Sequence, residues 1–313
     1  MNSTKDVLEY FLYDIKNRIL EYNLDDLEEI RVRSNRNILL KIGQEEIKVD
    51  YIINTNEILE ILQRICDNSI YTYQSQICNG YITIRGGHRV GITGNVVIKD
   101  GQVINISHIY SLNFRIARQV IGCSNGIMPY ILNLKENNVY NTVIISPPGR
   151  GKTTLLRDSI RSISNGLPNY GFHGITVGVV DERGEIAAMY KGIPQNDLGE
   201  RADILDNVSK DIGMKMLVRS MSPKVIVADE IGTKEDIEAI NYAVTSGVKG
   251  IFTAHGDSLE NITLNPILSK LYNLGILERI ILIEEKRNVK LIFSKWIYLK
   301  YVYHVEIQKI GGM

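Results

Sequence analysis

The chain has no excess of either charge, because 36 Lys and Arg residues are balanced by 36 Asp and Glu residues. Without a net positive charge, no global field gathers nucleic acid non-specifically, so direct nucleic-acid binding is not expected. Fixed-period repeats and low-complexity tracts are absent from the sequence. Hydrophobic residues make up 44% of the 313 residues and charged residues 23%, which is typical of a folded globular protein.

Cysteine is scarce. The sequence has three cysteines, Cys66, Cys78 and Cys123, none of them in a C-x-x-C spacing, so neither a disulfide framework nor a zinc site is expected.

The first twenty residues have an amphipathic helical pattern with interspersed charges, unlike a signal peptide. No window has the roughly 20 uncharged apolar residues of a membrane-spanning helix, since Lys295 and Lys300 interrupt the most apolar late stretch. We therefore expect a cytoplasmic protein that is peripheral at a membrane only through partner proteins.

The amino-terminal half is predicted to mix helices with short antiparallel strands. Apolar residues at helical spacing predict helices within the first twenty residues and at 57–66, and the pattern at 30–42 predicts a strand pair. Gly86-Gly87 and Asp100-Gly101 lie between alternating segments, so each predicts a hairpin turn. These elements together predict an α+β domain.

The length of the chain favours two domains. A short, polar, Gly-rich segment at 122–126 precedes a predicted helix at 128–134, and such segments are typical of domain boundaries. We therefore expect a smaller amino-terminal domain at 1–125 and a second domain at 126–313.

The second domain is predicted to be α/β with a mostly parallel sheet. Short, nearly continuous apolar runs alternate there with helical patterns, as in strands that are buried on both faces of a sheet. These runs are residues 140–145, 175–180, 225–228 and 250–253. The Pro- and Gly-containing stretch 190–213 is expected to be a long loop at a subunit contact or around a pore.

A glycine-rich loop follows the first of these runs and leads into a helical pattern. It matches G-x-x-x-x-G-K-[ST], with Ser146 in place of the first glycine. Gly151 lets backbone N–H groups point at phosphate oxygens, Lys152 reaches the β and γ phosphates, and Thr153 ligates Mg²⁺. The residues that we assign to ATP binding are Pro148, Gly149, Arg150, Gly151, Lys152, Thr153 and Thr154. The loop therefore predicts a site for ATP and Mg²⁺.

Two of the other runs end in acidic residues. The run at 225–228 leads into Asp229 and Glu230, so we expect Asp229 to hold Mg²⁺ through water and Glu230 to be the general base. The run at 175–180 leads into Asp181-Glu182-Arg183, so Glu182 competes with Glu230 as the base. We favour Glu230, with Glu182 as a polarising group or second base.

Further polar residues extend the predicted site. His255 follows the next apolar run and is the candidate sensor of the γ phosphate. Arg219 and Arg201 are candidates for stabilising transition-state charge, within the chain or across a subunit boundary. Ordinary structural roles stay open for all three. The catalytic candidates are Glu230, Glu182, Lys152, His255 and Arg219.

Together these segments resemble the stage III sporulation protein AA family. The resemblance is carried by residues 147–158, 180–187, 219–223, 80–84, 87–91 and 111–118. It implies a RecA-like P-loop core of the type II and type IV secretion motor superfamily. It also implies an ATP-hydrolysing homo-hexamer that serves membrane proteins of the channel between mother cell and forespore. From the same resemblance, Arg115 and Arg118 are expected to reach nucleotide phosphates from the amino-terminal domain.

Two other functions stay open. A RecA-like ATPase acting on nucleic acid shares this fold and chemistry, but it needs a basic, aromatic-lined track, and the neutral charge balance argues against it. A nucleotide-controlled scaffold would bind ATP with little turnover. The presence of Lys152, Asp229 and Glu230 argues for turnover.

Overall fold

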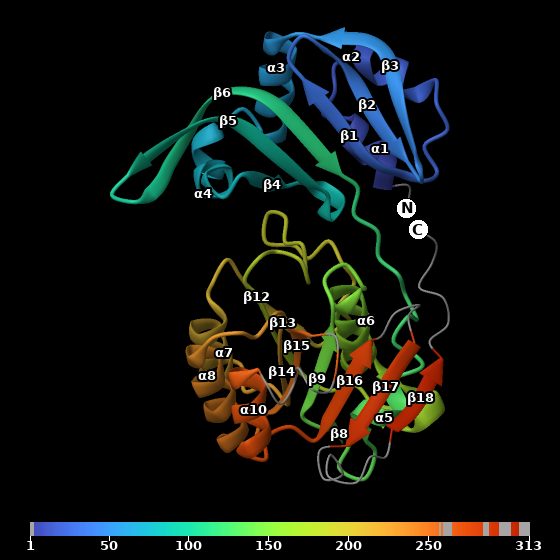
Figure 1. Cartoon of the computed structure of the whole chain (residues 1–313), viewed down its shortest axis with the longest axis vertical. Helices are drawn as coiled ribbons and strands as arrows, with labels where there is room; N and C mark the ends of the chain where they lie inside the picture. Colours follow the sequence, from blue (N-terminus) through green and yellow to red (C-terminus); the bar gives the residue numbers. More distant parts are fainter. Residues whose placement is uncertain (1–2, 257, 259–264, 284–287, 294–301, 307–313) are drawn as a thin grey trace. The chain divides into compact units, whose positions relative to one another are not determined.

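The computed structural model describes residues 3–256, 258, 265–283, 288–293 and 302–306 (Figure 1). By their contacts, the residues form two compact units. The first comprises Met1–Arg118 together with Ala188–Gln195, and the second comprises Gln119–Ala187 and the chain from Asn196 onward. The domain limits 1–125 and 126–313 stay a prediction.

The first unit is an antiparallel sheet with helices packed on it. Its strands lie in the order β3-β2-β1-β6-β5-β4. The strands are β1 (Leu27–Arg33), β2 (Arg36–Ile42), β3 (Glu45–Ile53), β4 (Tyr81–Thr83), β5 (Arg89–Lys99) and β6 (Gln102–Arg115). The helices are α1 (Ser3–Leu8), α2 (Tyr13–Leu20), α3 (Thr55–Ile65) and α4 (Gln74–Cys78), with 3-10 turns at Ile70–Tyr73 and Arg85–Gly87. Sheet and helices share one apolar core.

Most predicted elements of the first unit are confirmed. β1 pairs with β2, and the Gly86-Gly87 and Asp100-Gly101 turns join β4 to β5 and β5 to β6. Figure 1 shows β5 and β6 continuing beyond the other strands as a two-stranded arm. Residues 3–20 form the two helices α1 and α2, which are separate because the backbone is extended at Leu12. This break lets the ring of Phe11 pack at 4.8 Å from that of Phe114.

The second unit is built on a mixed sheet. Among the described residues its strands lie in the order β13-β12-β14-β15-β9-β16-β17-β18, parallel from β13 to β16 and antiparallel from there on. The strands are β9 (Thr142–Ser146), β12 (Val177–Asp181), β13 (Ala202–Asp206), β14 (Val225–Ala228), β15 (Lys249–His255), β16 (Arg279–Ile283), β17 (Asn288–Phe293) and β18 (Val302–Glu306). Two-residue strands pair as β7 (Leu132–Asn133) with β8 (Asn138–Val139) and as β10 (Gly166–Leu167) with β11 (Phe172–His173).

Helices cover both faces of the large sheet. They are α5 (Met128–Ile131), α6 (Lys152–Asn165), α7 (Lys210–Ser220), α8 (Lys234–Thr245) and α10 (Pro266–Asn273), with a 3-10 turn at Pro168–Tyr170. Alternate strand residues such as Ile145, Ile226 and Phe252 share a core with α7, α8 and α10. α6 contacts the same strands but has no residue in that core, so it covers the opposite face. The predicted α/β class with a mostly parallel sheet and an additional α+β part is confirmed.

Two predicted elements of the second unit differ from the structure. The helix expected at 128–134 ends at Ile131, because Leu132 is extended and pairs in β7. The loop expected at 190–213 is interrupted by β13, which pairs in parallel with β12, and α7 begins at Lys210. β13 is an edge strand of half-buried residues, so it lacks the apolar run that marks the central strands. No described helix combines the length and apolar character needed to cross a bilayer.

A buried carboxylate anchors α6 to the segment that begins the second unit. Asp158 accepts hydrogen bonds from the backbone of Gly122 (3.0 Å) and from the backbone (2.8 Å) and hydroxyl (2.7 Å) of Ser124, and it pairs with Arg161 at 2.8 Å. Burial alone would raise the pKa of Asp158, but these hydrogen bonds hold it below its usual value. These contacts therefore fix α6 against the segment at which the second unit begins.

Asp158→Asn is expected to lower the free energy of unfolding by about 3 kcal/mol, because an amide nitrogen replaces one acceptor oxygen among buried donors. Since the pKa is depressed in the folded protein, the contribution is fully present above the usual Asp range and is lost as the pH falls below about 4. Urea unfolding at pH 7 and pH 3 measures both effects. The exposed Asp50→Asn is the control, and equal stability of the two variants at pH 7 would contradict the assignment.

Candidate active site

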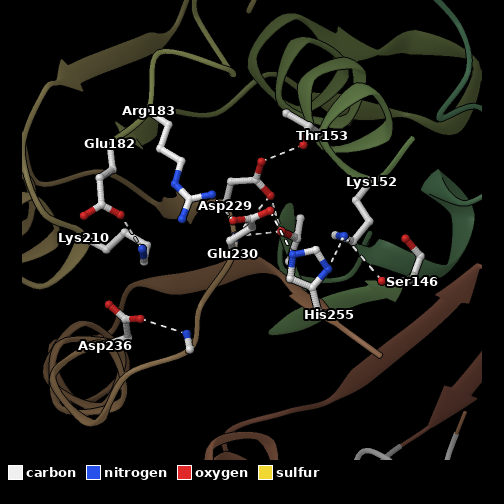
Figure 2. A network of polar contacts seen from close by, with 12 residues as sticks. Ser146, Lys152, Thr153, Glu182, Arg183, Lys210, Asp229, Glu230, Asp236 and His255 are labelled. Atoms are coloured by element: carbon white, nitrogen blue, oxygen red, sulfur yellow. Dashed lines mark hydrogen bonds and ion pairs between the residues drawn. The ribbon is translucent and has the colours of Figure 1, made fainter. Parts of the chain in front are cut away.

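The ends of four parallel strands meet at one edge of the large sheet. The loop 147–151 follows β9, Glu182 follows β12, Asp229 and Glu230 follow β14, and His255 ends β15. In the register of β9 and β15, Ser146 lies opposite His255. Figure 2 shows the polar side chains from these strands converging on one network. The carboxyl edge of an open parallel sheet is the usual place for a ligand site in α/β folds.

The glycine-rich loop has the backbone that its sequence predicts. Gly149 and Gly151 have φ of 71° and 87°, in the left-handed region where a side chain is disfavoured. α6 begins directly afterwards at Lys152, so the loop and the amino-terminal end of the helix present backbone N–H groups together. This arrangement suits an anion such as a phosphate group.

Lys152 is buried at the base of this loop. Its Nζ donates to the carbonyl of Ser146 at 3.3 Å and lies 3.0 Å from Nδ1 of His255. Burial lowers the pKa of Lys152, whereas Asp229 and Glu230 act in the opposite direction. The ammonium group is thus held near the acid pair by a backbone carbonyl and an imidazole nitrogen. It is available to a ligand that offers more negative charge.

Thr153 and Asp229 bring together two side-chain oxygen atoms of the kind that magnesium binds. The Thr153 hydroxyl donates to Oδ2 of Asp229 at 2.7 Å, although the two residues are on different elements. Among the described residues, no three His, Cys, Asp or Glu side chains are grouped to hold a metal. Mg²⁺ fits this site nevertheless, because it usually takes only one or two protein oxygens and fills its shell with water and phosphate oxygens.

Glu230 occupies the centre of the network. Its Oε1 lies 3.0 Å from Nε2 of His255, and its Oε2 accepts from Arg183 at 2.5 Å. Because the Lys152 ammonium can only donate, Nδ1 of His255 is the acceptor and Nε2–H donates to Glu230. His255 therefore connects the lysine of the loop to the preferred general base in one neutral tautomer.

Glu182 has a different environment. Its carboxylate is paired with Lys210, whose side chain is 11% exposed. The turn that carries Glu182 is fixed by Asp181, whose carboxylate accepts from the amides of Glu185, Ile186 and Ala187 at 2.8 to 3.0 Å. Glu182 and Glu230 line the same pocket. Glu230 directly follows Asp229, the residue that contacts Thr153, whereas Glu182 follows a different strand. This difference favours Glu230 as the base.

The remaining predicted residues have other surroundings. Pro148 and Arg150 lie in the loop, and Thr154 lies in the first turn of α6. Arg219 is on α7 and its guanidinium contacts Tyr242 of α8, and Arg201 donates to the carbonyl of Ser164 at 2.9 Å. Neither arginine is among the residues that line the pocket.

Arg115 and Arg118 belong to the first unit. Arg115 lies 3.9 Å from Glu29, and Arg118 pairs with Asp26 at 3.2 Å and donates to the carbonyl of Asp25. Their contact with nucleotide phosphates stays a prediction.

Three residues of the network were not assigned a role from the sequence: Arg183, Lys210 and Thr253. Each pairs with a predicted acidic residue, but the partners are far apart in the chain. Of these three, only Thr253 carries a recognisable signal, because it is a hydroxyl residue among the buried apolar residues of β15.

Comparison with solved structures defines the fold. The ATPase DotB of Yersinia pseudotuberculosis has a TM-score of 0.58 at 16% identity, covering 92% of this chain and 83% of that chain. The pilus retraction motor PilT, solved with bound ADP, has a TM-score of 0.56 at 15% identity, covering 91% of this chain and 84% of that chain. The fold is therefore that of the RecA-like secretion ATPases, with an additional amino-terminal part.

Sequence comparison defines the family more narrowly. The model of the family described as sporulation stage III, protein AA, matches residues 4–298, and the chain belongs to this family. Stage III sporulation protein AA of Bacillus subtilis (strain 168) is 40% identical over 272 residues, which cover 87% of each of the two chains. The resemblance noted from the sequence is confirmed.

Proposed function

We propose that this chain is a Mg²⁺-dependent ATPase and the motor subunit of a secretion-type complex in sporulation. The observation that carries the proposal is the 2.7 Å contact between Thr153, after the glycine-rich loop, and Asp229, at the end of another strand. The two predicted metal ligands lie beside Lys152 and Glu230, which supports the proposal. The chemistry of phosphoryl transfer needs these groups at one place.

In this proposal each side chain has one task. Lys152 leaves Nδ1 of His255 and donates to the β and γ phosphates of ATP. Glu230 orients the attacking water and accepts its proton. His255 contacts both Lys152 and Glu230, so it senses whether Lys152 has moved to the γ phosphate. Thr153 and, through water, Asp229 would hold a bound Mg²⁺, which would supply positive charge at the phosphate oxygens.

The setting of this activity is part of the proposal. The names of the B. subtilis relative and of the similar structures refer to sporulation, to ATPases and to a retraction motor. We infer a homo-hexamer in the cytoplasm that drives membrane proteins of the channel between mother cell and forespore. Arg115 and Arg118 are proposed to contribute charge to its nucleotide sites, and Arg219 or Arg201 to act across subunits.

ATP turnover by the full chain with Mg²⁺ tests the proposal against the nucleic-acid alternative. We expect turnover to be the same with and without single-stranded DNA, because the chain has no net positive charge to attract a polyanion. Strong stimulation by DNA would contradict the secretion-motor proposal and favour a nucleic-acid-dependent ATPase. Stimulation by the membrane proteins of the same sporulation complex would support the motor.

A further inference from the structure

One buried hydroxyl lies between the two acidic residues of the site. Thr253 is fully buried in β15, between β14 and β9. Its Oγ1 contacts Oδ1 of Asp229 and also lies 2.8 Å from the backbone nitrogen of Glu230. A hydroxyl has one proton to donate and lone pairs to accept with, so Thr253 donates to the carboxylate and accepts from the amide.

These contacts orient the carboxylate of Asp229. Thr253 and the amide of Glu230 (3.1 Å) occupy Oδ1, so Oδ2 is the atom that faces Thr153. Both oxygen atoms of Asp229 thus have defined partners on three different segments. Without the Thr253 contact, Oδ1 would be held only by the 3.1 Å contact with the Glu230 amide, and the carboxylate would rotate away from Thr153 more easily.

The same residue supports an unusual backbone conformation. Glu230 has φ of 50°, in the left-handed region that non-glycine residues rarely adopt. Its amide is held by Thr253 Oγ1, and the next amide, of Ile231, donates to the Thr253 carbonyl at 2.8 Å. These two bonds to one residue of β15 keep the Glu230 side chain directed into the network (Figure 2).

We infer that Thr253 is a positioning residue that sets the metal-binding carboxylate of Asp229 and the general base Glu230 in their working orientations. The inference rests on the proposed function of this site. Thr253 itself does not touch the reacting atoms in this scheme. It acts through two other residues, so its removal should impair the catalytic step and the use of Mg²⁺ more than the binding of ATP.

Thr253→Val tests this inference, because valine keeps the shape of the side chain but not the hydroxyl. We expect kcat to fall roughly 10- to 100-fold, as for other residues that orient a metal ligand, and more Mg²⁺ to be needed for half-maximal turnover. KM for ATP should change little. Thr253→Ser restores the hydroxyl and should restore most of kcat. Thr142→Val is the matched control, since Thr142 is equally buried in β9 and its hydroxyl donates to the carbonyl of Tyr140.

Two further measurements separate positioning from a general loss of structure. In the nucleotide-free protein, the amide of Glu230 should exchange its hydrogen faster in Thr253→Val, but not in Thr253→Ser or Thr142→Val. In a Glu230→Gln background, Thr253→Val should cause a smaller fold loss of kcat than in the wild-type background, because the part of its effect that acts through the base is already removed. The higher Mg²⁺ requirement should persist there, because the contact with Asp229 is still lost.

The outcomes distinguish this inference from the proposed function. If wild-type protein does not hydrolyse ATP, the proposed function fails, and the exchange of the Glu230 amide still tests the role of Thr253. If the wild type hydrolyses ATP and Thr253→Val matches it in kcat, Mg²⁺ dependence and amide exchange, the inference is overturned. Equal losses in Thr253→Val and Thr142→Val would also overturn it.

Discussion

Glu230→Gln is expected to reduce ATP turnover by at least about 100-fold, the usual contribution of a general base. Glutamine keeps the size of the side chain and an oxygen that can accept from Arg183 or His255, but it cannot take a proton from water. Nucleotide binding should therefore persist while hydrolysis is lost. Steady-state turnover together with binding of a fluorescent ATP analogue measures the two effects separately.

Glu182→Gln is the matched control for this substitution, because Glu182 lines the same pocket and is paired with Lys210. We expect a smaller loss of kcat than for Glu230→Gln. The opposite order would make Glu182 the base. If cells that carry Glu230→Gln form spores normally, hydrolysis is not the function, and a nucleotide-controlled scaffold is the better description.

Lys152→Ala is expected to weaken nucleotide binding as well as turnover. A charge-assisted hydrogen bond contributes about 1.5–3 kcal/mol, which corresponds to roughly 10- to 100-fold in affinity. Turnover should fall further, because the ammonium also stabilises charge that develops on the transferred phosphate. Binding of the fluorescent analogue and steady-state turnover again provide the two readouts.

Lys249→Ala controls for the loss of a partly buried ammonium group. Lys249 begins β15, at the opposite end of that strand from His255, and its Nζ lies 2.8 Å from Glu278. We expect this variant to bind and hydrolyse ATP like the wild type. Wild-type affinity in Lys152→Ala would show that the glycine-rich loop does not hold the phosphates.

The parallel core was predictable because its central strands are buried on both faces. The runs that became β9, β12 and β14 are nearly continuous apolar segments, and each leads into a polar or glycine-rich segment at the same edge of the sheet. Loop, acid pair and His255 could therefore be assigned to one site without knowledge of any contact. β13 was missed because its half-buried position at the edge of the sheet permits Asp203 and Asp206.

The pairings within the site were not predictable, since they depend on contacts between distant segments. Nothing in the local sequence indicates that Arg183 pairs with Glu230, or that Thr253 bonds to both acidic residues. The return of 188–195 to the first unit is likewise a matter of contacts, such as that between Lys191 and Asp67 at 2.6 Å. Local patterns specify elements, whereas these contacts follow only from the complete fold.

Calorimetric titration of the wild-type protein with ATP, in the presence and in the absence of Mg²⁺, tests the central claim most directly. If the loop after β9 wraps a triphosphate and Thr153 with Asp229 holds the metal, binding heat appears with Mg²⁺ and affinity falls when the metal is chelated. Absence of heat under both conditions would contradict the account, because none of the assigned groups would then have a nucleotide to act on.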